Sequence, residues 1–275
     1  MTRNGREASR GDGVASRVKG QPAGGLTVTF GPADIDFAEI DYQIDRPVVD
    51  LVPAGGLPIR VKLVDEWKEF RGAIRFCRRP EGGAVIDLVD VEDYLVGVVA
   101  AELPANFHRE AFRAQAIAAR TYTWYACQTT GLRRDWDVWA TERSQVYRGI
   151  ERERLVPQAA PAVRETRGIV CTWAGPAGEK IFCAYYSSRC GGTTAAALNL
   201  GENVPIPPLA GGVACPYCRF TVIVEPESIV FTGGRGMGHG KGMCQYGAEA
   251  MAQAGETAVS ILGHYYPGSR LTRAY

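Results

Sequence analysis

The chain has 275 residues, of which 46% are hydrophobic and 22% charged, a composition that suits a globular core of full size. Its 31 basic and 30 acidic residues leave a net charge of +1, so no overall field would draw it to nucleic acid or to an anionic membrane. A protein that binds polyanions through net charge alone is therefore excluded, and a charged partner has to be recognised locally.

The N-terminal part of the sequence differs in composition from the rest. Residues 1–25 are rich in Gly, Arg and Ser and poor in large apolar side chains, which predicts a disordered tail. Residues 26–47 mix short apolar alternation with prolines and aspartates, which predicts an extended lead-in to a main domain at 48–275. No apolar run approaches the roughly 20 residues that span a bilayer, and no signal-peptide pattern is present.

Three apolar runs near the start of the main domain have the alternation of strands. They are IRVKLV at 59–64, AIRFC at 73–77 and AVIDLVDV at 84–91, with turns expected at 65–68 and 81–83. The pattern predicts an antiparallel meander.

The rest of the domain alternates helical and extended patterns. Apolar residues recur at helical spacing from Glu110 to Thr129, which predicts a long central helix. GIVCTW and KIFCAYYSS are expected to pair across a turn at 175–178, and two short helices should follow a glycine-rich loop at 233–242. We therefore predict an α+β fold in which antiparallel strands pack on the central helix.

Glu102 lies in the apolar segment VEDYLVGVVAAELP, just before Pro104. Loss of water around a carboxyl group raises its pKa, so Glu102 could hold a proton at neutral pH and act as a general acid. The alternative is a structural glutamate at a helix end that meets backbone amides or a basic partner such as Arg120. Arg120 itself follows small residues at helical spacing, which indicates that it is partly buried.

The segment GRGMGHGKGMCQYG places five alternating glycines around His239. Such a loop lets backbone approach a ligand closely, and a histidine between two glycines contributes little to a core. The spacing fits neither nucleotide-binding glycine motif, so this loop does not predict nucleotide binding.

Three cysteines in the C-terminal third of the chain have the spacing of metal ligands. Cys190 precedes Cys215-Pro-Tyr-Cys218, whose two-residue gap is typical of structural zinc sites. Cys183 and Cys244 are candidates for the fourth ligand, and water is another. A redox pair or a disulfide are the rival interpretations, although either would leave Cys190 unexplained.

Four ordered blocks together resemble one family, the sporulation stage II protein D and amidase-enhancer LytB domain. They are EDYLVGVVAAELP with EAFRAQAIAARTY, SQVYRG, AYYSSRCGGTT, and GRGMGHGKGMCQYGAEAMAQAG with ILGHYYPG. The resemblance covers roughly Val48 to Tyr275. It implies a lytic transglycosylase that cleaves peptidoglycan strands between N-acetylmuramic acid and N-acetylglucosamine.

The resemblance also implies roles for individual residues. Glu102 falls on the family's catalytic glutamate, and the residues expected to line a glycan groove are Arg120, Gln145, Tyr147, Ser188 and His239. It further implies a location outside the cytoplasm at the cell wall, a link to sporulation, and possible partnership with a separate amidase. The rivals are a binding module that enhances this amidase and, third, a zinc-dependent amidase or peptidase. One departure is Ser187, where many relatives carry a histidine.

Overall fold

The structure is a computed structural model that describes residues 17–20, 26–29, 48–53, 57–63, 66–79, 82–176, 178–199, 203, 205–215, 217–218, 221–225, 227–232 and 236–275. This part of the chain has a mixed fold of six α-helices and mainly antiparallel sheets. It divides into two compact units, Met1–Gly97 with Tyr147–Arg154, and Val98–Val146 with Leu155–Tyr275.

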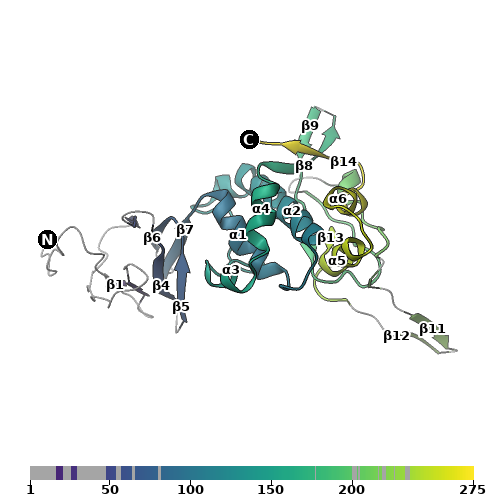
Figure 1. Ribbon diagram of the computed structural model, residues 1–275, viewed down its shortest axis with the longest axis horizontal. Helices are drawn as coiled ribbons and strands as arrows, with labels where there is room; N and C mark the ends of the chain where they lie inside the picture. The colour runs from purple at the N-terminus through teal and green to yellow at the C-terminus, as the bar shows by residue number, and fades with distance from the viewer. Residues whose placement is uncertain are drawn as a thin grey trace, which may run out of the picture. The chain divides into compact units, whose positions relative to one another are not determined.

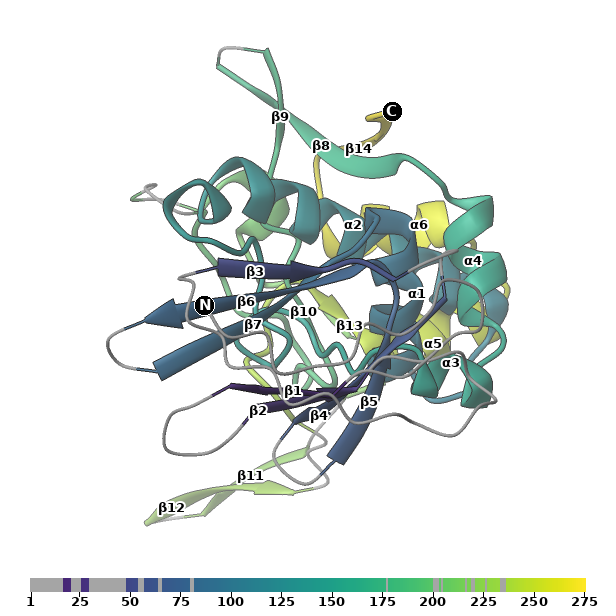
Figure 2. The same cartoon turned by 90° about the vertical axis from the view of Figure 1, so that its left-hand side faces the viewer.

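The first unit contains two antiparallel sheets (Figure 2). One has the order β1-β2-β4-β5 and is formed by β1 (Arg17–Gly20), β2 (Leu26–Thr29), β4 (Ile59–Leu63) and β5 (Glu66–Phe70). The other has the order β3-β6-β7 and is formed by β3 (Val48–Leu51), β6 (Ala73–Arg79) and β7 (Gly82–Leu88).

The expected meander differs from these sheets in three places. Its first strand, β4, pairs with β2 and β5 instead of β6, so the three predicted strands do not form one meander. The turn predicted at 65–68 is wrong, because β5 begins at Glu66 and pairs with β4, burying Phe70. The strand predicted to run to Val91 ends at Leu88. Asp90 Oδ1 accepts the Glu92 N–H at 2.8 Å, and this contact starts helix α1 (Val91–Glu102).

The predicted tail and lead-in fall mostly outside the described residues. Only 17–20 and 26–29 of residues 1–47 are described, and they form β1 and β2. The boundaries at residues 25 and 47 stay predictions.

The second unit contains the longest helix, α2 (Arg109–Gln128). It begins at the N-cap His108, whose Nδ1 accepts the Glu110 N–H. Thirteen of its residues are buried, which fits the apolar pattern read from the sequence. Helices α4 (Ala159–Glu165), α5 (Gln245–Gln253) and α6 (Ala258–Tyr265) contact it, as does strand β8 (Ile169–Gly175) (Figure 1).

Strands in the second unit form three small sheets. Strand β8 pairs with β14 (Ser269–Arg273) and with β9 (Gly178–Ile181), and β11 (Thr221–Glu225) pairs with β12 (Ser228–Thr232). Strand β10 (Tyr186–Ser187) instead pairs in parallel with β13 (Met243–Cys244). The strand predicted over 180–188 is thus broken after Ile181, since its end joins a distant segment. The remaining elements are helix α3 (Glu151–Leu155) and the 3-10 turns at Gly131–Arg133 and Pro207–Leu209.

Candidate functional site

The Glu102 carboxyl group is held at the end of α1 by groups that lie far away in the sequence. The Val146 N–H donates to Oε1 at 2.9 Å, and the Gln245 side-chain amide donates to Oε2 at 3.1 Å. The Tyr186 hydroxyl is a third hydrogen-bonding partner of this carboxyl group, and its contact lowers the pKa of Glu102. Each carboxyl oxygen therefore has a fixed partner. The alternative interpretation expected a structural glutamate that meets backbone amides or Arg120. The Val146 N–H is such an amide, whereas the Arg120 guanidinium donates to backbone carbonyls instead.

Two of these partners, Tyr186 and Gln245, lie in or directly after the parallel pair β10–β13. The register sets Tyr186 beside Met243 and Ser187 beside Cys244, and Gln245 begins helix α5 directly afterwards. Gln245 is 5% exposed and lies near the buried Gln115, whose Oε1 is 3.5 Å from its amide. A strand pair of two residues thus brings two side chains to one carboxylate.

Burial raises the pKa of Glu102 above the usual value of a glutamate, and the hydrogen bonds from Val146 and Gln245 oppose that rise. The negative charge of Glu142 raises it further. A carboxyl group with this balance is protonated at a higher pH than an exposed glutamate. It can therefore donate a proton to a leaving group and take one back.

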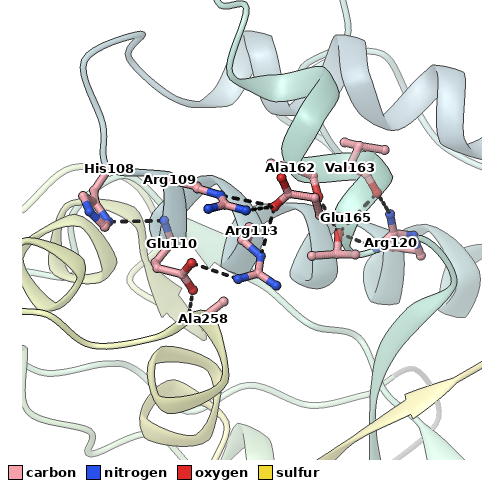
Figure 3. Close-up of polar contacts among 10 residues, drawn as sticks. His108, Arg109, Glu110, Arg113, Arg120, Ala162, Val163, Glu165 and Ala258 are labelled. Carbon is pink, nitrogen blue, oxygen red and sulfur yellow. Dashed lines mark hydrogen bonds and ion pairs between the residues drawn. The ribbon is translucent and has the colours of Figure 1, made fainter.

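The carboxylate of Glu110, near Glu102 in sequence, has a structural role. Glu110 accepts hydrogen bonds from the Ala258 N–H at 2.8 Å and from Arg113 at 2.9 Å, which ties α2 to the start of α6 (Figure 3). Glu142, on the loop that follows the turn at Gly131–Arg133, is exposed and acts on Glu102 through its charge. The sequence reading missed Glu142 because no motif marks it.

Four cysteines converge next to the strand pair. The sulfur atoms of Cys190, Cys215, Cys218 and Cys244 all lie within 4.8 Å of one another, and all but Cys190 are buried. The sulfurs of Cys218 and Cys244 are 3.6 Å apart. None of the eight cysteines, all of which lie among the described residues, forms a disulfide, so the disulfide interpretation is wrong for this structure.

The cluster has the composition and spacing of a tetrahedral metal site. Four thiolates at about 2.3 Å from a zinc ion would have their sulfurs about 3.8 Å apart, a separation that these four reach with small adjustments. Hydrogen bonds among these thiols lower the pKa of Cys215 and raise those of Cys190 and Cys244, so the three sulfurs share their protons. Cys183 is a buried thiol outside the cluster, and burial raises its pKa to about 12. Of the two candidates for the fourth ligand, the structure therefore favours Cys244.

Arg120 and Gln145, both expected in a glycan groove, are fully buried. The Arg120 guanidinium donates to the Val163 carbonyl at 3.2 Å and so holds the end of α4 (Figure 3). It also donates to the carbonyl of Ile169, the first residue of β8, at 3.2 Å. The Gln145 amide donates to the Ala119 carbonyl at 3.1 Å and its oxygen accepts from Thr123 at 2.7 Å. Gln145 thus fixes the backbone just before Val146, whose N–H contacts Glu102.

Tyr147 belongs to the first unit, whereas the other predicted site residues belong to the second. Its hydroxyl donates to Asp87 Oδ2 at 2.9 Å, and its ring packs on Tyr94 and Phe70. Burial raises the pKa of Asp87 to about 7, although the Tyr147 hydrogen bond opposes the rise. No acceptor or donor among the described residues reaches Asp87 Oδ1.

We expect Asp87→Asn to be more stable than the wild type at pH 8 by about 1–3 kcal/mol. The native pKa lies above the unfolded one, so the stability that Asp87 contributes is present below pH 4 and is lost as pH rises toward 7. Asparagine can still accept from Tyr147 but carries no charge to bury. Urea unfolding at pH 4, 6 and 8 measures the difference. Asp50→Asn is the control. The hydrogen bond from Arg75 lowers the pKa of Asp50, so we expect this variant to be less stable than the wild type at pH 8. An Asp87 variant less stable than wild type at pH 8 would contradict the assignment.

His239 and Ser188 lie on the segments that flank β10 and β13. The His239 ring is exposed, its Nδ1 accepts the Lys241 N–H at 3.0 Å, and its edge contacts Tyr185. Partial loss of water and the Lys241 charge lower its pKa, which favours the neutral ring. The glycine loop is described from Gly236 onward. Gly242 has φ +64, and a Cβ there would lie 1.8 Å from the Tyr185 carbonyl oxygen, so its close approach is to the protein's own backbone.

Comparison with known proteins agrees with the resemblance seen in the sequence. A family model described as stage II sporulation protein matches residues 81–173. An uncharacterized protein of Brachyspira hyodysenteriae is 28% identical over 271 residues, covering 73% of this chain and 71% of that protein. Stage II sporulation protein D of Bacillus subtilis is 24% identical over 262 residues, covering 69% of this chain and 76% of that protein.

A shorter match, with a higher percentage of identical residues, links the chain to a second kind of protein. The amidase enhancer of Bacillus subtilis is 52% identical over 52 residues, which cover 18% of this chain and 7% of the enhancer.

Among the described residues, no helix combines the length and apolar character needed to cross a membrane.

Proposed function

We propose that this chain, which belongs to the stage II sporulation protein D family, is a peptidoglycan lytic transglycosylase with Glu102 as its catalytic acid. The observation that carries the proposal is the Glu102 carboxyl group, desolvated and fixed through both oxygens by Val146 and Gln245. Such a group combines a raised pKa with a set direction for its proton.

The proposed reaction uses one carboxyl group twice. Glu102 protonates the glycosidic oxygen as the bond breaks, and its carboxylate then takes the proton from the 6-hydroxyl of the same muramic residue. That hydroxyl closes on the anomeric carbon, so the nucleophile belongs to the substrate and water is not consumed. Hydrolysis ordinarily needs a second carboxylate to activate water or to form a covalent intermediate.

The loop that precedes Val146 carries an aromatic side chain suited to sugars. Trp139, 37% exposed, lies on the same loop as Glu142, and the Arg143 guanidinium is 5.2 Å from its ring centre. Aromatic rings of this kind pack against the apolar faces of sugars. His239 and Ser188 are proposed as further glycan contacts, while Arg120 and Gln145 support the fold behind the acid. A glycan role for Tyr147 stays a prediction.

Zinc is the metal that four thiolates would hold best, through Cys190, Cys215, Cys218 and Cys244. With all four positions filled by sulfur, its role would be structural. Ser187, which stands where many relatives carry a histidine, pairs with the cluster residue Cys244. A metal that relatives held through a histidine at that position would here meet the Cys244 thiolate instead.

The alternative function is a cell-wall-binding enhancer of a separate amidase, without catalysis of its own. The likeness to the amidase enhancer favours it, although that likeness covers a small part of that protein. Both functions act on the cell wall, so we propose a location outside the cytoplasm in either case.

Mass spectrometry of the products from purified glycan strands tests the proposal. We expect fragments that end in 1,6-anhydromuramic acid, because the 6-hydroxyl replaces water as the nucleophile. Reducing ends that carry 18O from labelled water would instead indicate a hydrolase. Intact strands, together with stimulation of an added amidase, would favour the enhancer.

A further inference from the structure

A half-buried arginine lies beside the cysteine cluster and makes no ion pair with any described residue. This residue, Arg189, directly precedes Cys190. Its Nε is buried, and none of the described groups accepts a hydrogen bond from it. No described carboxylate pairs with this partly buried cation, and burying a cation without a hydrogen-bonded counter-charge is costly, which suggests that a ligand supplies one.

The Arg189 guanidinium rests on an aromatic group. Its Cζ lies 4.0 Å from the centre of the Tyr246 ring. That ring also stacks on Tyr217, with centroids 5.4 Å apart, and meets the edge of Phe107 at 5.1 Å. Since these contacts already occupy Tyr246, the guanidinium is the group of this stack that can recognise a ligand. Stacking leaves the in-plane N–H fork of an arginine available.

The backbone holds Arg189 in place. Its N–H donates to the Met237 carbonyl at 3.0 Å, and the Met237 N–H donates back at 2.8 Å. The Tyr246 N–H donates to the Ser188 carbonyl at 3.2 Å, and Tyr246 follows Gln245, which bonds to Glu102. The stack is therefore connected to the acid through adjacent residues.

We propose that Arg189, stacked on Tyr246, binds a carboxylate of the glycan in a subsite next to Glu102. The inference rests on the function proposed above. A planar guanidinium and a carboxylate form two parallel hydrogen bonds, so the pair would also fix the orientation of the strand. Every muramic residue carries a carboxylate, either on its free lactyl group or on the peptide attached to it. The subsite would thus recognise the muramic side of the strand.

Binding measurements in a Glu102→Gln background test this without cleavage. The probes are soluble muramic glycan without peptides, the same glycan with peptides, and N-acetylglucosamine oligomers, which have no carboxylate. We expect Arg189→Gln to weaken binding of a carboxylate-bearing probe about tenfold or more and to leave the oligomers unchanged. Arg270→Gln, which removes the same charge from an exposed strand, is the matched control.

The outcomes separate the possible roles of Arg189. A loss confined to the peptide-free glycan identifies the lactyl carboxylate, and a loss confined to the other glycan identifies the peptide. Unchanged binding of both would overturn the proposal. Loss of zinc with equal weakening of all three probes would also overturn it, because Arg189 would then balance the cluster's charge. If the wild-type chain binds with this selectivity but does not cleave the glycan, the transglycosylase proposal is wrong while the carboxylate subsite is supported.

Discussion

Glu102→Gln is expected to reduce glycan cleavage by about a hundredfold to ten thousandfold while glycan binding remains. Glutamine has the shape of the carboxyl group and can still accept the Val146 N–H. The Gln245 amide can turn to accept from it, because that side chain now meets a donor instead of an acceptor. What the variant lacks is a proton that it can give and recover. The change thus removes the chemistry and keeps the geometry.

The rate of product release from glycan strands, together with a binding measurement, checks this expectation. Glu142→Gln is the matched control, since it makes the same substitution on the carboxylate whose charge acts on Glu102. That charge raises the pKa of Glu102, so its removal should move the fall of activity at high pH to a lower pH. Activity at the optimum should stay within about a few fold.

Two results would contradict the one-carboxylate mechanism. Appreciable cleavage by Glu102→Gln would mean that another group is the acid. A loss in Glu142→Gln as large as that in Glu102→Gln would indicate a second catalytic carboxylate, and with it hydrolysis.

Local patterns predicted elements well where one face of a segment is buried. The helix expected from Glu110 to Thr129 runs from Arg109 to Gln128, and the turn at 175–178 joins β8 to β9. The patterns failed where a distant segment decides the structure. The sequence predicts a turn at Asp65 to Lys68 because three of these four residues are polar, yet pairing with β4 makes Glu66–Phe70 a strand. Strand β10 exists only through its pairing with β13.

The candidate site divides in the same way. Glu102 could be singled out from its apolar neighbours, but its partners Val146 and Gln245 lie 44 and 143 residues further along the chain. Spacing carries no signal at that range. The buried position of Arg120 could be inferred from its small neighbours, whereas the carbonyls of Val163 and Ile169 that it contacts could not. The spacing of the cysteines gave three of the four clustered sulfurs, and the fold was needed to choose between Cys183 and Cys244.

Cys244→Ala is expected to remove bound zinc from the chain, lower the melting temperature by roughly 10 °C and reduce turnover at temperatures where the variant is still folded. Three thiolates hold zinc less tightly than four, and the free energy of metal binding is part of the free energy of folding. The effect on turnover follows from position. The Cys244 sulfur accepts the Gly247 N–H at 3.3 Å and caps α5, whose first residue is Gln245. Loosening this cap frees the amide that bonds to Glu102.

Elemental analysis, calorimetry and initial rates on protein purified under reducing conditions measure the three effects. Cys183→Ala is the matched control, since it removes a buried thiol outside the cluster and should keep about one zinc per chain. If Cys244→Ala retained its zinc while Cys183→Ala lost it, the fourth ligand would be Cys183. If zinc were lost but the melting temperature and turnover did not change, the cluster would support neither the fold nor the acid. We expect the melting temperature and turnover to fall together. Strand β10 contains Tyr186 and leads to Cys190, and β13 ends at Cys244, directly before Gln245. The segments that hold the cluster therefore also place two partners of Glu102.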